Sequence, residues 1–199
     1  MEIAIAALIG YSIGSIPWAL IIGSVFYKTD IRKHGSGNLG GTNAGRVLGK
    51  KAGVSVSVLD ALKSVLATAV VYFIFPQQIA VAGFMAAIGH CFPLFANFKG
   101  GKAVASIMGF LLSMGLFQLM PIWIFIIALG SFFAILYLTK YVSLSSMLSI
   151  VIALIATTFF EIDSMYRVYL GLLLALTIWR HKENIRRILK KEERKITWM

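Results

Sequence analysis

The chain has 199 residues, 59% of them hydrophobic, and a mean hydropathy of +0.85. Soluble domains are about 45–50% apolar, so this composition argues against a soluble fold. The chain nevertheless carries 19 Lys and Arg against 8 Asp and Glu, which gives a formal net charge of +11. Its charges are clustered between long uncharged stretches, a pattern typical of an integral membrane protein with basic loops.

The uncharged stretches predict the membrane spans. Residues 64–98 and 103–139 carry no charge, and each stretch is too long to cross a hydrocarbon core of about 30 Å only once. Turn-forming residues near Pro76 and Pro121 divide each stretch into two helices. We therefore predict an all-α integral membrane protein, with six spans as the alternative to seven. The seven short transmembrane helices are residues 3–26, 52–74, 79–96, 104–114, 122–138, 142–160 and 165–179.

The basic residues predict the orientation. With seven spans, most of them fall on one side, at residues 28–51, Lys99, Lys102, Lys140 and residues 180–195. The positive-inside rule then places the N-terminus outside and the C-terminus in the cytoplasm. Met1 and Glu2 do not form the basic start of a signal peptide, so the first helix is expected to be retained. We expect residues 1–199 to form one membrane domain.

The first predicted cytoplasmic loop, residues 33–46, is rich in glycine and in hydrogen-bonding side chains. Glycines let a backbone approach an anion closely, and an arginine can bind phosphate through two parallel hydrogen bonds. The segment is neither a Walker A motif nor a dinucleotide-binding fingerprint, and a flexible interhelical loop is the alternative. The candidate ligands of phosphate or of the acceptor are Ser36, Gly37, Asn38, Gly40, Thr42, Asn43 and Arg46.

A second segment, with residues 89–93 followed by residues 98–102, again joins glycine and lysine at the cytoplasmic end of a span. An ordinary positive-inside turn is the alternative. The topology favours a functional interpretation, because predicted spans two, four and six would all begin on the cytoplasmic side, the last of them at Ser143. Helix N-termini attract phosphate, so three neighbouring ones would form a strong phosphate site.

Two charged residues, Asp60 and Lys63, lie three positions apart within the second predicted span. Intramembrane charges generally face protein or water and mark function. We expect these two to form a pair, and the sequence leaves a structural and a catalytic role equally open. The basic tail after Arg180 has interleaved apolar residues, which predicts that most of its charges lie on anionic lipid.

Other classes of partner are disfavoured. Membrane orientation explains the basic excess, and no stacking or groove-reading motif is present, so nucleic acid is not expected as a partner. The three histidines are far apart in sequence, and no Cys/His or carboxylate cluster has ligand spacing. We therefore expect no metal and no cofactor.

Three motifs taken together resemble the PlsY family of acyl-phosphate:glycerol-3-phosphate acyltransferases. They are residues 36–43, residues 89–93 with 98–102, and residues 181–185. The resemblance covers the whole chain, including its length, its seven spans and its outside N-terminus. It differs from the expected pattern in having Gly41 in place of alanine, and Ser64, Ala103 and Lys191 in place of glycine.

The resemblance implies transfer of a fatty acyl group from acyl phosphate to the 1-hydroxyl of sn-glycerol 3-phosphate, with lysophosphatidic acid and phosphate as products. The location implied is the bacterial inner membrane, with the active site facing the cytoplasm. The expected partners are acyl phosphate, glycerol 3-phosphate and membrane lipid, and a monomer is the working hypothesis.

The hypothesis assigns three groups of residues. Lys102, His181 and Ser143 form the catalytic set. His90, Gly100, Gly101 and Asn184 join the first loop in binding substrate or phosphate, and Asp60 and Lys63 have a structural or orienting role.

The reaction needs no strong protein base, because an acyl phosphate is already activated; orientation and charge stabilisation carry such a transfer. The proton acceptor stays open among a substrate phosphate oxygen, His181 and His90. A transporter or channel for phosphate or a phosphorylated solute is the second hypothesis. A non-enzymatic lipid-binding or scaffold protein is the third.

Overall fold

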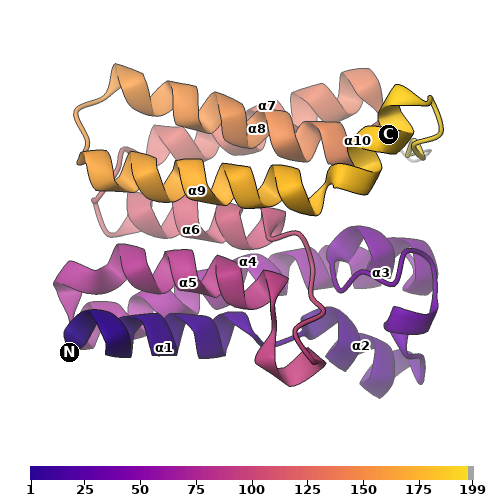
Figure 1. Cartoon of the computed structure of the whole chain (residues 1–199), viewed down its shortest axis with the longest axis horizontal. Coiled ribbons are helices and arrows are strands. Elements are labelled where there is room, and N and C mark those ends of the chain that lie inside the picture. Colours follow the sequence, from indigo (N-terminus) through magenta and orange to yellow (C-terminus); the bar gives the residue numbers. More distant parts are fainter. Residues whose placement is uncertain (197–199) are drawn as a thin grey trace. The chain divides into compact units, whose positions relative to one another are not determined.

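The computed structural model describes residues 1–196, and every regular element in that range is helical (Figure 1). The α-helices are α1 (Glu2–Gly14), α2 (Trp18–Tyr27), α3 (Gly41–Leu48), α4 (Lys50–Ile74), α5 (Ile79–Cys91), α6 (Val104–Leu116), α7 (Ile122–Thr139), α8 (Val142–Ala156), α9 (Ser164–Arg180) and α10 (Lys182–Leu189). Short 3-10 turns are η1 (Ile31–Lys33), η2 (Pro76–Gln78), η3 (Leu94–Ala96) and η4 (Thr157–Phe159).

Internal contacts divide the chain into two compact units, Met1–Ser113 and the part from Met114 onward. That residues 1–199 act as one membrane domain stays a prediction, and residues 197–199 lie outside the described part of the chain.

Five helical segments are long and apolar enough to cross a membrane: Glu2–Tyr27, Lys50–Ile74, Pro76–Ala96, Ile122–Thr139 and Val142–Phe159. The remaining two predicted spans coincide with α6, a shorter apolar helix of 13 residues, and with α9, which has 17 residues. The all-helical architecture is thus as predicted. The total of seven spans and the orientation of the termini stay predictions.

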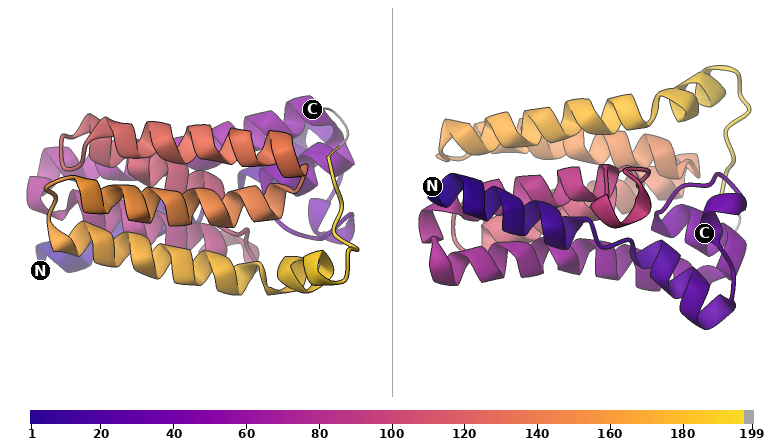
Figure 2. Two further views of the ribbon diagram at one scale, coloured as in Figure 1. Left: turned by 90° about the horizontal axis from the view of Figure 1, so that it is seen from above. Right: turned by 60° about the horizontal axis from the view of Figure 1, so that its bottom comes forward.

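In the first unit, α1 packs closely against α5 (Figure 2). A Cβ added at Gly10 would collide with the backbone of Ala82, and one added at Gly14 would collide with the backbone of Ala86. Small residues four apart on both helices let the two backbones approach, which is a common packing mode of helices in membranes.

The first predicted span is interrupted, contrary to the expectation of one continuous helix over residues 3–26. α1 ends at Gly14 and α2 begins at Trp18. Pro17 causes the break, because proline has no N–H to donate and disfavours helical backbone at the preceding residue, Ile16.

The glycine-rich segment is only partly a loop, because it becomes helix α3 at Gly41. Gly49 separates α3 from α4 with φ +98°, a backbone conformation that glycine adopts without strain. The two helices then run antiparallel, with Gly41 beside Ser57 and Gly45 beside Gly53.

Helix α6 packs against α4 beyond the part that α3 contacts, and it runs parallel to α4. A Cβ at Gly109 of α6 would collide with the backbone of Ala61, and Thr68 of α4 donates a 2.9 Å hydrogen bond to Ser113.

In the second unit, α7 packs on α8 and α8 packs on α9. The chain after α10 folds back onto the turn between α7 and α8, where the Ile196 N–H donates to the Lys140 carbonyl at 2.9 Å. The tail is therefore bound to its own unit at that point.

Candidate active site

The N-termini of α3 and α6 reach α4 at nearly the same level. Gly41, the first residue of α3, lies against Ser57, and Ser106 near the start of α6 donates a 3.0 Å hydrogen bond from its Oγ to the Asp60 carbonyl. At 1.5 Å per residue, these two contacts are about 5 Å apart along α4. Because α3 is antiparallel to α4 and α6 is parallel to it, both positive helix ends point toward this level. Two such ends favour a bound anion.

This arrangement corrects one part of the predicted phosphate site. The sequence placed the N-terminus of the second span, which is α4, directly after the glycine-rich loop. In the structure α3 intervenes, and α4 begins at Lys50, about 15 Å along its axis from Asp60. The N-terminus of α3 therefore takes the place that was expected for the N-terminus of α4. The N-terminus of the fourth predicted span, α6, lies at this level as expected.

Asn43 holds the glycine-rich loop together. Its side chain is buried, its Oδ1 accepts the Ser36 N–H at 2.8 Å, and its Nδ2 donates to the carbonyls of His34 at 3.2 Å and Ile31 at 3.4 Å. These bonds use both amide hydrogens. The geometry therefore favours a loop-shaping role for Asn43 over direct phosphate binding.

The remaining candidates of this loop lie closer to its surface. Thr42 and Arg46 are exposed and lie one turn apart on α3, so they share a face of that helix. Ser36 is also exposed, while Gly37, Asn38 and Gly40 are partly exposed. Gly37 has φ +68°, and its N–H donates to the His34 carbonyl at 3.0 Å. The structure thus brings a hydroxyl and a guanidinium together on one helix.

Gly100 and Gly101 attach the second motif to the end of α5. The Gly100 N–H donates to the Cys91 carbonyl at 3.2 Å, and the Gly101 N–H donates to the His90 carbonyl at 3.0 Å. A Cβ at Gly101 would collide with the His90 ring, and one at Gly100 would collide with the His90 carbonyl. Both glycines therefore fix the segment that carries Lys102, a half-buried residue two positions before α6 begins at Val104.

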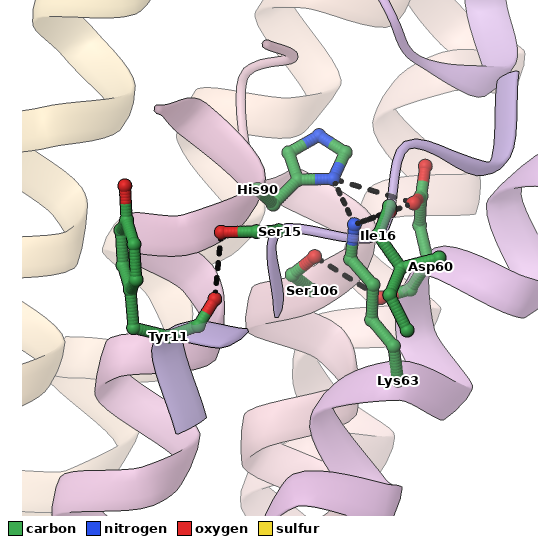
Figure 3. A network of polar contacts seen from close by, with 7 residues as sticks. All are labelled: Tyr11, Ser15, Ile16, Asp60, Lys63, His90 and Ser106. Atoms are coloured by element: carbon green, nitrogen blue, oxygen red, sulfur yellow. Dashed lines mark hydrogen bonds and ion pairs between the residues drawn. The ribbon is translucent and has the colours of Figure 1, made fainter. Parts of the chain in front are cut away.

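The predicted pair of Asp60 and Lys63 forms, and it includes a third residue (Figure 3). Lys63 Nζ lies 2.9 Å from Asp60 Oδ1 and 2.9 Å from His90 Nδ1, and it donates to the Ile16 carbonyl at 3.0 Å. His90 Nδ1 lies 3.3 Å from Asp60 Oδ1. All three side chains are at most 5% exposed. His90, predicted as a substrate ligand, is thus placed in a buried charged network.

The second unit gathers two predicted residues around a third that the sequence analysis did not single out. Glu193 Oε1 accepts hydrogen bonds from Ser143 Oγ at 2.8 Å and from Asn184 Nδ2 at 2.5 Å. Glu193 Oε2 accepts from Arg187 Nε at 2.7 Å. Ser143 is the second residue of α8 and Asn184 lies on α10, so the carboxylate joins two helix starts.

Glu193 is charged in this setting. Burial raises the pKa of Glu193, but the hydrogen bonds from Asn184, Arg187 and Ser143 outweigh it and hold the pKa below its ordinary value of 4.5. The only available signal in the sequence was an acidic residue within a basic tail. Most charges of that tail were predicted to lie on lipid. Arg187 and Glu193 instead bind each other within the protein.

His181 lies at the junction of α9 and α10 and is 3% exposed. Its Nδ1 is 2.8 Å from the Thr177 carbonyl. A carbonyl oxygen can only accept, so this bond places a ring proton on Nδ1. In the neutral ring, Nε2 is then the accepting nitrogen.

Comparison with known proteins gives a consistent result. A family model described as glycerol-3-phosphate acyltransferase matches residues 4–191. A glycerol-3-phosphate acyltransferase of Bacillus velezensis is 48% identical over 199 residues, and one of Bacillus subtilis is 46% identical over 200 residues; both matches cover 100% of each chain.

Two solved structures are also similar. One is the crystal structure of PlsY, an integral membrane glycerol 3-phosphate acyltransferase, in its glycerol 3-phosphate form. Its TM-score is 0.89 at 29% identity, with 99% of this chain and 96% of that chain covered. The lysophosphatidic acid form has a TM-score of 0.87 at 28% identity and the same coverage. The resemblance of the three motifs is thus confirmed, and this chain belongs to the glycerol-3-phosphate acyltransferase family.

Proposed function

We propose that this protein transfers a fatty acyl group from an acyl phosphate to the 1-hydroxyl of sn-glycerol 3-phosphate, giving lysophosphatidic acid and inorganic phosphate. The family supports an acyltransferase that uses glycerol 3-phosphate, and the acyl phosphate donor is inferred from the motif resemblance. The observation that carries the proposal is that α3 and α6 both begin at nearly the same level of α4, so that Thr42 on α3 and Lys102 before α6 belong to these two helix starts. Such a place suits phosphate, which both substrates carry.

The reaction balances without a cofactor. The acceptor hydroxyl oxygen attacks the carbonyl carbon, the new ester C–O bond forms, and the bond from that carbon to the phosphate oxygen breaks. Phosphate leaves with the electron pair, and the hydroxyl proton ends on it. Arg46, Lys102 and the helix N-termini would neutralise the charge that develops on the leaving phosphate, and such preorganised stabilisation is commonly the largest catalytic contribution.

The residues of the second unit suit the acceptor. In a neutral His181 the Nε2 atom accepts hydrogen bonds, so we assign it to bind the attacking hydroxyl of the acceptor. Ser143 and Asn184 are both hydrogen-bonded to Glu193. The proton reaches the phosphate either directly or through His181. His181→Ala separates these routes: near-normal turnover at saturating substrates excludes His181 as an essential base, whereas a loss of about 10²-fold or more supports relay through it.

The membrane arrangement is proposed along with the activity. Seven spans, an outside N-terminus and a cytoplasmic active-site face in the bacterial inner membrane agree with the positive-inside rule. The working hypothesis of a monomer is kept. Single cysteines introduced at Glu2 and at Lys190, both exposed, should react with a membrane-impermeant thiol reagent from opposite sides of sealed vesicles. Labelling from the same side would refute the odd number of spans.

The decisive experiment measures phosphate release by the purified protein from a long-chain acyl phosphate, with and without glycerol 3-phosphate, and with acyl-CoA in parallel. Release that depends on the acceptor, with lysophosphatidic acid formed, is the expected result. Activity with acyl-CoA alone would overturn the donor. A folded protein that turns over neither donor would overturn the proposal, and protein-dependent solute uptake into vesicles would then favour a transporter.

Arg46→Lys tests the phosphate assignment within this assay. Lysine keeps the charge but loses the two-pronged guanidinium, so the KM of a phosphate-bearing substrate should rise. Arg32→Lys is the matched control, because Arg32 pairs with Asp30 through Nε and Nη2, each at 2.9 Å. If Arg46→Lys behaves like this control for both substrates, Arg46 is not a phosphate ligand.

A further inference from the structure

The buried network of Asp60, Lys63 and His90 has no direct step in the proposed reaction, yet it lies at the level of α4 where α3 and α6 begin. The Asp60 carbonyl accepts the hydrogen bond from Ser106 near the start of α6. Buried charges inside a membrane protein are costly and seldom lack a task. This location connects the network to the arrangement of the phosphate site.

The Lys63 ammonium connects three segments of the first unit. Its ammonium has three N–H groups, and three partners surround it: the Ile16 carbonyl at the break between α1 and α2, Asp60 on its own helix, and His90 on α5. The contact with Asp60 is a buried ion pair, with 2.9 Å between Lys63 Nζ and Asp60 Oδ1. Charge neutralisation alone would not require the other two partners.

The bond to Lys63 sets the tautomer of His90. Two groups face His90 Nδ1: the Lys63 ammonium at 2.9 Å, which only donates, and Asp60 Oδ1 at 3.3 Å, which only accepts. The shorter contact, with Lys63, favours an accepting Nδ1 and a ring proton on Nε2. An imidazolium would instead place two cations in contact beside a single carboxylate, in a site at most 5% exposed. That arrangement is costly in a low-dielectric interior.

His90 in turn holds the second motif. Its carbonyl accepts the Gly101 N–H, and its ring occupies the space that a Cβ at Gly101 would need, with Nε2 on that side. A change in the orientation of the ring would therefore displace Gly101 and the adjacent Lys102. The chain of contacts runs from Asp60 and Lys63 through His90 to the segment that leads into α6.

We propose that Asp60 and Lys63 are positioning residues that fix the orientation and the Nε2–H tautomer of His90, and through it the placement of residues 100–102 beside a substrate phosphate. The inference rests on the proposed function, since it assigns a cause to the geometry of the same site. None of the three side chains takes part in bond making.

A double-mutant cycle separates positioning from simple charge balance. Asp60→Asn and Lys63→Met each leave a buried charge without its counter-ion and should lower the melting temperature, whereas the double variant removes both charges and should regain much of it. Methionine cannot bind His90 Nδ1 or the Ile16 carbonyl. The positioning role therefore predicts that the double variant, though stable, keeps a KM at least about tenfold higher for one phosphate-bearing substrate, with kcat changed much less.

Thr68→Val is the matched control. Thr68 lies on the same helix, buried, with its hydroxyl bonded to Ser113 of α6, about two turns from Asp60. This variant should lower stability without raising either KM. If the double variant regains both stability and the wild-type KM values, the network is structural only and the proposal is overturned.

Histidine-selective ¹⁵N NMR provides a readout that is independent of activity, and remains decisive if the single variants fail to fold. With His34→Gln and His181→Asn used for assignment, His90 should show a protonated Nε2 and an unprotonated Nδ1. A protonated Nδ1 in the wild-type protein would overturn the proposal. Absence of acyl transfer by the wild type would instead refute the proposed function, while the NMR result would still report on the network.

Discussion

Lys191→Gly should stabilise the protein, because Lys191 occupies a position that suits glycine. The residue follows the C-cap of α10 with φ +60°, in the left-handed region. Its N–H donates to the Ile188 carbonyl at 3.0 Å, and the Glu192 N–H donates to the Arg187 carbonyl at 2.8 Å. These two bonds form a Schellman motif, in which glycine is the usual left-handed residue.

The expected change in the free energy of unfolding on Lys191→Gly is the difference between two opposing effects. A left-handed conformation costs an L-residue about 1–2 kcal/mol relative to glycine, while the greater freedom of glycine in the unfolded chain costs about 0.5–1 kcal/mol. Lys191 is exposed, so little burial is lost. The net gain should be about 0.5–1 kcal/mol, or about 1–4 °C in melting temperature for a chain of this size.

The assay compares thermal unfolding in detergent and hydrogen exchange over residues 187–196, because the tail can open locally without global unfolding. Lys190→Gly is the matched control: it removes the same charge, but Lys190 has an ordinary helical φ of −84°, so glycine should destabilise there. An unchanged or weaker protection of the tail in Lys191→Gly, or the same response in both variants, would refute the reasoning.

Three further predictions concern stability. The pKa of Glu193 is lowered in the folded protein, so its ion pair with Arg187 stabilises the fold fully above pH 4.5 and less as the pH falls through the folded pKa. Glu193→Gln should make the melting temperature less dependent on pH between about pH 7 and about pH 3.5. Gly41→Ala should cost about 1–3 kcal/mol, measured by unfolding, with only partial recovery by Ser57→Gly, because a Cβ at Gly41 also lies 2.7 Å from the carbonyl of Gly53. Ala103→Gly should be nearly neutral in the same assay, since relief of its positive φ is offset by chain entropy and by the lost burial of a methyl group worth about 0.8 kcal/mol.

The positions of most helices follow from composition, for a physical reason. Backbone groups in a hydrocarbon core must bond within their own helix, so a long uncharged stretch leaves few alternatives. The pairing of Asp60 with Lys63 could also be predicted from the sequence, because a spacing of three residues puts both side chains on one helix face. Local sequence thus contains enough information for these features.

Other features depend on contacts between distant segments. Helix α3 has 8 residues, a length at which an isolated helix is marginal, and it is held by close packing on α4 through Gly41 and Gly53. The role of Glu193 depends on Ser143, which is 50 residues away. Neither contact leaves a local pattern in the sequence, which predicts a loop at residues 41–46 and gives no sign that Glu193 binds Ser143.

Gly100 and Gly101 of the second motif are important to the site, but for a physical reason that differs from the predicted one. The sequence predicts a role in phosphate binding for Gly100 and Gly101, because glycine allows a backbone to wrap an anion. In the structure, their N–H groups bind the carbonyls at the end of α5, and their missing Cβ atoms leave room for His90. An alanine at Gly101 would therefore act on phosphate binding indirectly, by displacing the imidazole that Lys63 holds. If so, Gly101→Ala and the double variant of Asp60 and Lys63 should raise the KM of the same substrate, and combining them should add little, because both act through one ring.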